Sequence, residues 1–278
     1  MRRAALLLAG LAATSGCTGL FFRPDNFLYK RPDDRLEYVT PRFASLDGTP
    51  LTGLFLCARK SPVLGTVVHF HGNSGNFTGH FGYTEWLVDE GFNVFVPDYR
   101  GYGNSKGTPT SVGVVEDAVA AIRYVRTRPE VGGARVFVLG QSLGGAIATV
   151  AAVRSGPEAV RALALECPVS SYRSVARAAL RATFVTRVLL RPLTGILVSD
   201  AVSPVKAVPD LAPIPLLILH GDADTVVPHS EGAALFQAAR EPKEMVTIPG
   251  GRHTEAFTKF GHVYRAKLVE FYRRAAAS

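Results

Sequence analysis

The stretch that decides the fold reads ARVFVLGQSLGGAIATVAAV and covers residues 134–153. Its first part, 134–140, is a β-branched and apolar run that predicts a buried strand, and the part after 143 predicts a buried helix. Ser142 stands between the two, with a glycine two residues before it and another two residues after it. A strand, a Gly-x-Ser-x-Gly turn and a helix are typical of a nucleophile elbow, a strained turn that presents a serine. Ser142 is therefore the candidate nucleophile.

The alternation of strand and helix extends over most of the chain. Further buried strands are predicted at 63–70, 92–101, 161–167, 214–221 and 243–250. Further helices are predicted at 77–90, at 111–129 with Ser111 as its N-cap, and at 255–275. Apolar strands that alternate with helices indicate a mostly parallel sheet covered on both faces. Two earlier runs, 36–40 and 51–58, predict antiparallel strands that lead into this sheet. We therefore expect an α/β fold.

Residues 168–212 interrupt this alternation, because they contain no predicted strand and lie between two strands expected to be neighbours. We interpret them as a small helical cap. The cap carries Arg173, Arg177 and Arg181 at intervals of four, which places them in one stripe along a helix. Such a stripe could contact an anionic membrane surface, or it could be an ordinary solvated helix face.

The first residues differ in kind from the rest. Two arginines precede an apolar run at 4–13, which is too short to cross a hydrocarbon core of roughly 30 Å and has the layout of an export signal. The signal ends in TSGC, which resembles a bacterial lipoprotein box with Cys17 as the acylated residue. We expect a lipoprotein-type signal over 1–17, a tether over 18–35, and a folded domain over 36–278. The protein would then be exported and membrane-anchored, and a soluble periplasmic or secreted protein is the alternative.

The composition of the chain argues against some classes of protein. The 31 Lys and Arg residues exceed the 23 Asp and Glu residues, giving a net charge of +8. Zinc-ligand spacings, RNA-binding patterns and blocks of like charge are absent from the sequence, so we expect no nucleic-acid partner. The three cysteines do not form a disulfide framework. Cys57 and Cys167 lie in apolar runs and are expected to be buried thiols, although a single bridge between them stays open.

A nucleophilic serine needs a base that is itself held by an acid, and with an elbow of this type the chain order is Ser, acid, His. Among the histidines after Ser142, His253 follows the last predicted strand in a glycine-rich loop and is the candidate base. The others end a strand, begin a helix or lie within one: His220, His229 and His262. The acid should follow the strand at 214–221, where Asp222 and Asp224 are both available. Spacing alone does not choose between them.

Five motifs now stand in a fixed order along the chain. They are HFHGNSGN (69–76), VPDYRGYGNS (96–105), LGQSLGG (139–145), LHGDADTVVP (219–228) and PGGRH (249–253). Together they resemble the α/β-hydrolase superfamily, and within it the membrane-associated serine hydrolases related to the bud-emergence proteins and the α/β-hydrolase-domain depalmitoylases. The resemblance covers about residues 35–275.

The resemblance implies a mostly parallel, eight-stranded-type sheet with helices on both faces and a cap. It implies that Asp224, rather than Asp222, completes a triad with Ser142 and His253. The backbone N–H groups of Leu143 and Asn73 would form the oxyanion hole. Ser74, beside Asn73, and Tyr99 are expected at the substrate pocket, and no metal or organic cofactor is required.

We therefore expect a serine hydrolase that cleaves a carboxylic ester or thioester with an apolar acyl part through an acyl-enzyme on Ser142. The alternatives are a serine peptidase or aminopeptidase of the same fold, and an acyltransferase in which an alcohol or amine replaces water. A non-catalytic interaction protein that retains the fold is a third alternative, which the intact set of candidate residues disfavours.

Overall fold

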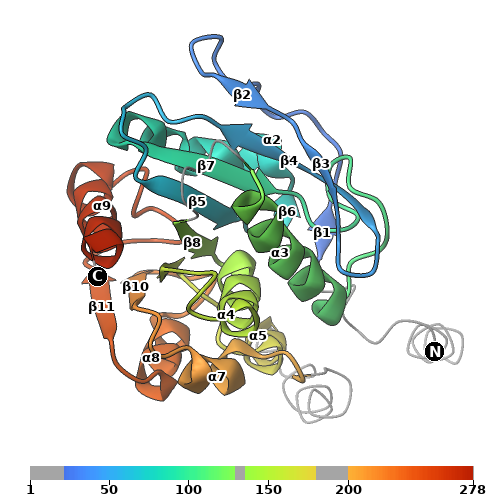
Figure 1. The fold of residues 1–278 in the computed structure, drawn as a ribbon. Helices are drawn as coiled ribbons and strands as arrows, with labels where there is room; N and C mark the ends of the chain where they lie inside the picture. The colour runs from blue at the N-terminus through green and yellow to red at the C-terminus, as the bar shows by residue number, and fades with distance from the viewer. Residues whose placement is uncertain (1–21, 129–134, 180–199, 278) are drawn as a thin grey trace, which may run out of the picture.

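The computed structural model describes residues 22–128, 135–179 and 200–277. A single large sheet runs through these residues in the order β11-β10-β9-β8-β5-β7-β4-β2, with β3 paired to β4 (Figure 1). Its parallel strands are β5 (Gly65–Phe70), β7 (Phe92–Pro97), β8 (Val136–Gln141), β9 (Ala162–Glu166), β10 (Leu216–Gly221) and β11 (Lys243–Ile248). The antiparallel end consists of β2 (Tyr38–Val39), β3 (Arg42–Ala44) and β4 (Pro50–Leu56). The mostly parallel sheet and its antiparallel lead-in are both confirmed.

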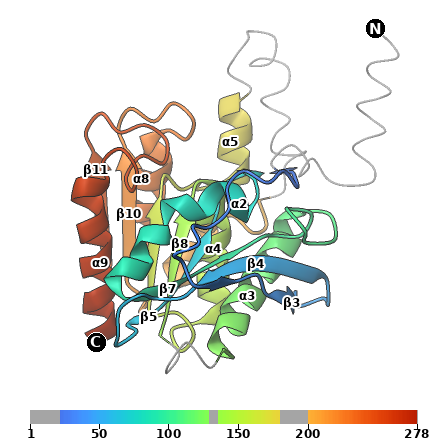
Figure 2. The same cartoon turned by 90° about the horizontal axis from the view of Figure 1, so that it is seen from above.

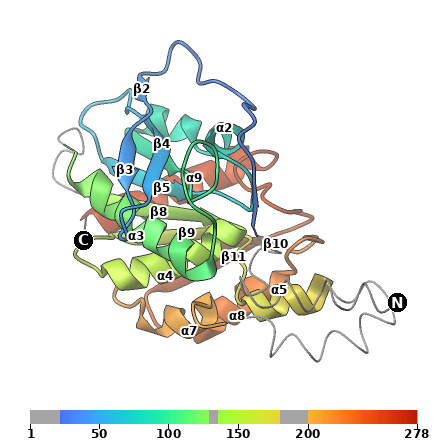
Figure 3. The same ribbon diagram turned by 90° about the vertical axis from the view of Figure 1, so that its right-hand side faces the viewer.

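Helices cover both faces of the sheet. One face carries α3 (Ser111–Arg126), α4 (Leu143–Ser155) and α8 (His229–Ala238), of which α3 and α4 lie side by side (Figures 1 and 3). The other face carries α9 (Gly261–Ala277), with α2 (Phe77–His80) and the 3₁₀ turns η2 (Phe81–Tyr83) and η3 (Glu85–Glu90). Because successive side chains of a strand point to opposite faces, Val138 of β8 packs toward α3 and α4 while Phe137 packs toward α9. Both faces are therefore apolar, as a continuous apolar strand predicts.

Two local predictions differ from the structure. Residues 77–90 are not one helix but a short helix and two 3₁₀ turns, and the segment contains Gly79 and Gly82, which weaken an α-helix. The N-cap of α3 is Thr110, whose side chain accepts the N–H of Gly113 at 3.0 Å. Ser111 is the first residue of that helix rather than its cap.

The insertion between β9 and β10 contains helices and irregular stretches, but no strand, where the structure describes it. It contains α5 (Tyr172–Ala179), which projects from the body of the molecule in Figure 2, and then α7 (Pro204–Ala207) and η7 (Val208–Asp210). Arg173 and Arg177 lie on α5, whereas Arg181 lies outside the described residues. The arginine stripe therefore stays a prediction.

The N-terminal segment interpreted as a tether packs on the domain where it is described. The short strand β1 (Arg23–Pro24) pairs in parallel with β6 (Ser74–Gly75), and Phe22 is 5% exposed in the core. Cys17 and the proposed signal lie outside the described residues. Within the part of the chain that the structure describes, none of the helices combines the length and apolarity needed to span a membrane.

Cys57 and Cys167 are not joined to each other by a disulfide. Cys167 is buried, as expected, and Cys57 is half-buried. The alternative of a bridge between them is therefore wrong.

Candidate active site

Ser142 occupies a strained turn at the end of β8. Its φ of 54° and ψ of −119° lie in a region that non-glycine residues rarely adopt, and its N–H donates to the carbonyl of Glu166 at 2.9 Å. A Cβ atom at Gly144 would lie 2.0 Å from the carbonyl oxygen of Phe70, and one at Gly140 would be 2.7 Å from its nearest neighbours. The elbow therefore closes only with glycine at these two positions, as the sequence pattern predicts.

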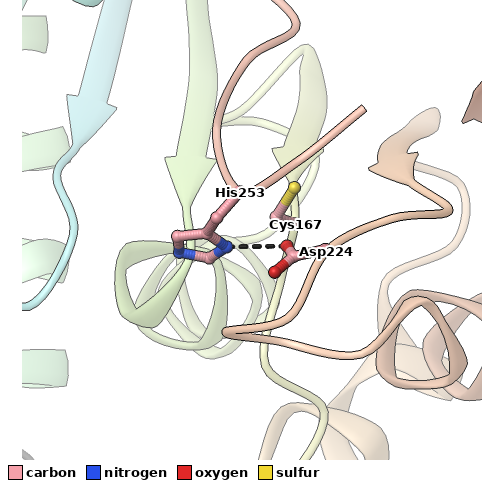
Figure 4. A group of neighbouring side chains, drawn as sticks. All are labelled: Cys167, Asp224 and His253. Atoms are coloured by element: carbon pink, nitrogen blue, oxygen red, sulfur yellow. Dashed lines mark hydrogen bonds and ion pairs between the residues drawn. The ribbon is translucent and has the colours of Figure 1, made fainter. Parts of the chain in front are cut away.

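Ser142 forms one end of a hydrogen-bonded chain of three side chains. Its Oγ lies 3.0 Å from Nε2 of His253. Nδ1 of the same imidazole lies 2.7 Å from Oδ2 of Asp224, the bond drawn as a dashed line in Figure 4. When the Nδ1 proton faces the carboxylate, Nε2 is free to accept the proton of the serine hydroxyl. The three residues come from separate loops after β8, β10 and β11, so the sheet brings together positions that are far apart in the sequence.

Asp224 is held as a carboxylate. Its Oδ1 accepts the N–H groups of Val226 and Val227 at 2.8 and 2.9 Å. Burial alone would raise the pKa of this carboxyl, but the imidazoles of His220 and His253 and the N–H of Val227 hold the pKa well below its usual range. The ionised form is therefore the form that faces His253.

Among the described residues, neither the alternative acid nor any other downstream histidine is bonded to Ser142. Asp222 accepts the N–H of Gly250 at 2.7 Å and is exposed, so it supports the loop of His253 without touching the imidazole. His220 is buried, bonds the carbonyl of Val227 at 2.9 Å and lies 3.6 Å from Oδ2 of Asp224, so it supports the turn that carries the acid. His229 begins α8, where it is half-buried and lies 2.9 Å from the Thr247 hydroxyl, and His262 lies within α9 and is exposed.

A cavity of about 380 Å³ opens over Ser142. Its lining residues are Arg23, Gly72, Asn73, Ser74, His80, Tyr83, Gln141, Ser142, Leu143, Val169, Tyr172, Val226, Val227, His253 and Thr254. The two candidate oxyanion residues and Ser74 are thus all at the cavity. The Asn73 side chain fixes its own loop, because its Oδ1 accepts the N–H of Arg23 at 2.9 Å and the hydroxyl of Tyr102 at 3.2 Å.

Tyr99 does not line this cavity, contrary to the prediction. It is 1% exposed, and its hydroxyl donates to the carbonyl of His71 at 3.0 Å. The ring packs against the rings of Phe70 and Tyr102. Tyr99 therefore supports the Gly72–Asn73 loop from inside the protein.

A buried polar chain beneath the elbow was not predicted. Nδ1 of His69 lies 3.1 Å from the Thr84 hydroxyl, and Nε2 lies 2.7 Å from Oε1 of Gln141. The amide of Gln141 donates to Oε2 of Glu166 at 2.5 Å, and Oε1 of Glu166 accepts the N–H of Ala256 at 2.7 Å. The only sequence signal is the placement of polar residues inside apolar strands. These hydrogen bonds connect the strand that precedes Ser142 to the loop that carries His253.

Burial governs the protonation of this chain. It raises the pKa of the Glu166 carboxyl to about 7, although the hydrogen bonds from Gln141 and Ala256 favour the carboxylate. It also lowers the pKa of His69 to about 3, helped by the nearby His80. His69 is therefore neutral at pH 7, and Glu166 is divided between its two forms.

One further group near Ser142 has donor types that could bind a metal. The sulfur of Cys167, an oxygen of Asp224 and a ring nitrogen of His253 lie within 4.8 Å of one another (Figure 4). Burial raises the pKa of the Cys167 thiol well above its usual range, and the His253 nitrogen is already bonded to Asp224. Ligation would require breaking that bond and deprotonating the thiol, so the arrangement favours hydrogen bonding over metal binding.

The sheet order, the elbow after β8 and the loop positions of the three bonded side chains define an α/β-hydrolase. A family model described as serine aminopeptidase, S33 (Hydrolase_4) matches residues 61–208, more than half of the chain. The chain belongs to this family.

Relatives agree with this assignment. The chain is 37% identical to protein YfhR of Escherichia coli strain K12, over 88% of this chain and 86% of that protein. It is 27% identical to protein bem46 of Schizosaccharomyces pombe, over 85% of this chain and 77% of that protein. Among solved structures, the esterase Pf2001 of Pyrococcus furiosus superimposes with a TM-score of 0.74 at 17% identity, covering 91% of this chain and 97% of that one. The structural match shows a common fold.

Proposed function

We propose that the protein hydrolyses a carboxylic ester or thioester through an acyl-enzyme on Ser142. The observation that carries the proposal is the hydrogen-bonded chain from Ser142 Oγ through His253 to Asp224, at 3.0 and 2.7 Å. Both distances are within hydrogen-bond range, as proton transfer from Ser142 to His253 and orientation of the imidazole by Asp224 require. Ser142 and His253 both line the cavity, so the serine hydroxyl is accessible to a substrate.

The mechanism follows from the positions of Ser142, His253 and Asp224. His253 Nε2 takes the proton of the Ser142 hydroxyl as Oγ attacks the acyl carbonyl, and the buried carboxylate of Asp224 orients and stabilises the resulting imidazolium. The imidazolium then protonates the leaving alcohol or thiol, which departs and leaves the acyl group on Oγ. Water, deprotonated by the same imidazole, attacks the acyl-enzyme and releases the acid.

The tetrahedral intermediates need donors for their oxyanion. The proposal assigns the backbone N–H groups of Leu143, the first residue of α4, and Asn73, both of which belong to residues that line the cavity. The N-terminus of α4 adds a favourable electrostatic field. Loss of one such donor would reduce transition-state stabilisation by about 3 kcal/mol.

An aminopeptidase is the second candidate, because the family description names that activity. An aminopeptidase has to bind the positively charged α-amino group of its substrate, for which a carboxylate is the natural partner. The described residues that line the cavity include neither Asp nor Glu. Residues 180–199 of the cap segment also contain no acidic residue in the sequence. Ester or thioester substrates therefore fit the cavity better.

Labelling with a fluorophosphonate tests the nucleophile. We expect covalent labelling of the wild-type protein and its complete loss in Ser142→Ala. Ser74→Ala is the matched control, since Ser74 lines the same cavity and meets the imidazole of His80 through its backbone carbonyl, at 2.7 Å, rather than through its hydroxyl. Labelling that survives in Ser142→Ala would contradict the proposal. Turnover of 4-nitrophenyl esters compared with amino-acid 4-nitroanilides then separates esterase from aminopeptidase, and product analysis with an added alcohol detects acyl transfer.

We also propose that the protein is exported and anchored through a lipid on Cys17, with the arginines of the cap facing anionic headgroups. The sequence of residues 1–17 and the spacing of Arg173, Arg177 and Arg181 support this. Metabolic incorporation of a labelled fatty acid should disappear in Cys17→Ser and persist in Cys57→Ser. Incorporation that persists in Cys17→Ser would overturn the anchor.

A further inference from the structure

Arg23 is held at the edge of the cavity by its own backbone. Its N–H donates to Oδ1 of Asn73 at 2.9 Å, and β1 pairs residue by residue with Ser74 and Gly75. Phe22, immediately before it, is buried in the core. Arg23 is one of the residues that line the cavity, and it is exposed to solvent. A segment that lies about 50 positions from the Asn73 loop in sequence thus places a guanidinium at the cavity.

This guanidinium has no counter-ion in the described part of the chain. Arg23 takes part in none of the ion pairs found there, and the cavity lining described above contains no acidic residue. Asp25, two residues away, is engaged by other groups, because its carboxylate accepts the Tyr29 hydroxyl at 2.5 Å and the Asn76 amide at 3.1 Å. Residues 1–21 and 180–199 contain neither Asp nor Glu in the sequence.

Arg23 also differs from the other basic side chains of the cavity lining. Burial lowers the pKa of His80 to about 4, with a further contribution from nearby His71, so His80 is neutral at pH 7. His253 is assigned to proton transfer. Within the described lining, Arg23 therefore carries the permanent positive charge.

The part of the cavity lining that comes from the segments after β9 and β10 is largely apolar, in contrast to the charged Arg23. It consists of Val169 and Tyr172 from the first segment and Val226 and Val227 from the second. The described part of the lining thus combines an apolar surface with one unpaired cation, which suits a substrate that has an apolar part and a negatively charged part. A guanidinium binds an anionic oxygen group in a bidentate manner and keeps its charge at every physiological pH.

We propose that Arg23 binds an anionic group of the substrate and so makes the protein select esters or thioesters that carry a negative charge. The inference rests on the proposed function, because it concerns the substrate that reacts with Ser142. Arg23 is a specificity-determining residue that contacts the substrate away from the scissile bond. The anionic group can belong to the acyl part or to the leaving group, and each source has its own arm in the test.

The test compares matched pairs of esters. The first pair tests the acyl part: mono-4-nitrophenyl adipate and 4-nitrophenyl hexanoate have the same acyl chain length and differ in a terminal carboxylate. The second pair tests the leaving group: 4-carboxyphenyl hexanoate carries a negative charge there, and 4-carbamoylphenyl hexanoate does not. In Arg23→Gln we expect kcat/KM for the charged member of one pair to fall by about tenfold, and for its neutral partner to change by less than about twofold. Arg23→Lys should retain most of the selectivity.

Controls separate this effect from net charge and from folding. Arg123→Gln removes one positive charge from α3, where the side chain is exposed and does not line the cavity, and should leave all four esters unaffected. Raising the salt concentration from about 0.05 M to about 0.5 M should weaken the selectivity of the wild-type protein, because an exposed charge is screened. Competition by benzoate and by phenyl phosphate indicates which anionic group binds more tightly to the wild-type protein.

The outcomes are distinct. If the wild-type protein is labelled at Ser142 and hydrolyses the neutral esters, but Arg23→Gln changes charged and neutral esters equally, the role of Arg23 is overturned and the proposed function stands. If the wild-type protein is neither labelled nor active on any ester, both proposals fail. If Arg23→Gln lowers kcat/KM for only one of the charged esters, the result supports both proposals and identifies the part of the substrate that carries the charge.

Discussion

Asp224 Oδ2 lies 2.7 Å from His253 Nδ1, and the carboxylate is fully buried behind an imidazole that is 20% exposed. Asp222, two residues earlier, contacts the N–H of Gly250 instead. The choice between two neighbouring acids is therefore made by the turn after β10, which directs one carboxylate toward the imidazole and the other toward the loop backbone.

Replacing these two acids should separate their roles. We expect Asp224→Asn to lower kcat by about four orders of magnitude, because an amide can no longer hold the imidazole in the tautomer that accepts the serine proton. Asp222→Asn should leave kcat close to that of the wild-type protein. Steady-state kinetics with a 4-nitrophenyl ester measure both. Equal losses in the two variants would contradict the assignment of the acid.

The elbow should be intolerant of any side chain at Gly144. A methyl group there would lie 2.0 and 2.4 Å from the carbonyl oxygens of Phe70 and His71, which are backbone atoms of β5 and the loop after it and cannot easily move. We expect Gly144→Ala to lower the free energy of unfolding by about 3 kcal/mol.

Gly82→Ala is the control, because the only neighbour of its added methyl group within 4 Å would be a Glu85 oxygen at 3.9 Å. Urea unfolding of the wild-type protein and both variants provides the comparison. Similar stabilities for the two variants would show that the backbone around the elbow adapts.

Glu166 should make the stability depend on pH. Its pKa is raised from 4.5 to about 7 in the folded protein, so the folded state binds this proton more tightly than the unfolded state. The contribution is fully present below about pH 4.5 and is lost as the pH rises through about 7, amounting to about 3 kcal/mol.

Glu166→Gln removes the titrating group, so the difference in unfolding free energy between wild type and variant should change with pH over this window. Glu158→Gln, at an exposed position, should leave the difference constant. Urea titrations at about pH 4.5 and pH 8 measure this. A constant difference for Glu166→Gln would show that the folded and unfolded states bind this proton equally.

The ion pair between Arg100 and Asp117 should contribute to stability. The guanidinium donates to Asp117 Oδ1 at 2.8 Å, and the two side chains are 10% and 2% exposed. We expect Asp117→Asn to cost about 3 kcal/mol, because it leaves a largely buried cation with fewer partners. Asp33→Asn, which breaks the exposed pair with Arg35, should change the melting temperature little. Calorimetry of both variants is the measurement.

The sequence predicted those parts of the site that have a local signal. The turn at Ser142 is preceded by a strand and followed by a helix, and the glycine-rich loop of His253 follows the last strand; both patterns are readable within about 20 residues. Asp224 was separated from Asp222 only by resemblance to a family, since two acids in one turn have the same local pattern.

The positions of Tyr99, Glu166 and Arg23 depend on contacts between segments far apart in the chain. Tyr99 follows a strand that could equally have directed its ring into the cavity, and the packing of Phe70 and Tyr102 decided otherwise. Arg23 lies in a segment rich in Pro, Asp and Arg that is typical of a linker. Its pairing with Ser74 is set by the edge of a two-stranded sheet, which no periodicity in the segment indicates.

The pairing of β1 with β6 also limits how far the cavity can be from any anchor at the start of the chain. Phe22 is buried, so it is a fixed point of the domain, and Cys17 precedes it by five residues. A fully extended chain of that length reaches about 18 Å. A lipid on Cys17 would therefore keep the mouth of the cavity close to the bilayer surface, where the protein would meet its substrates by diffusion within the plane of the membrane.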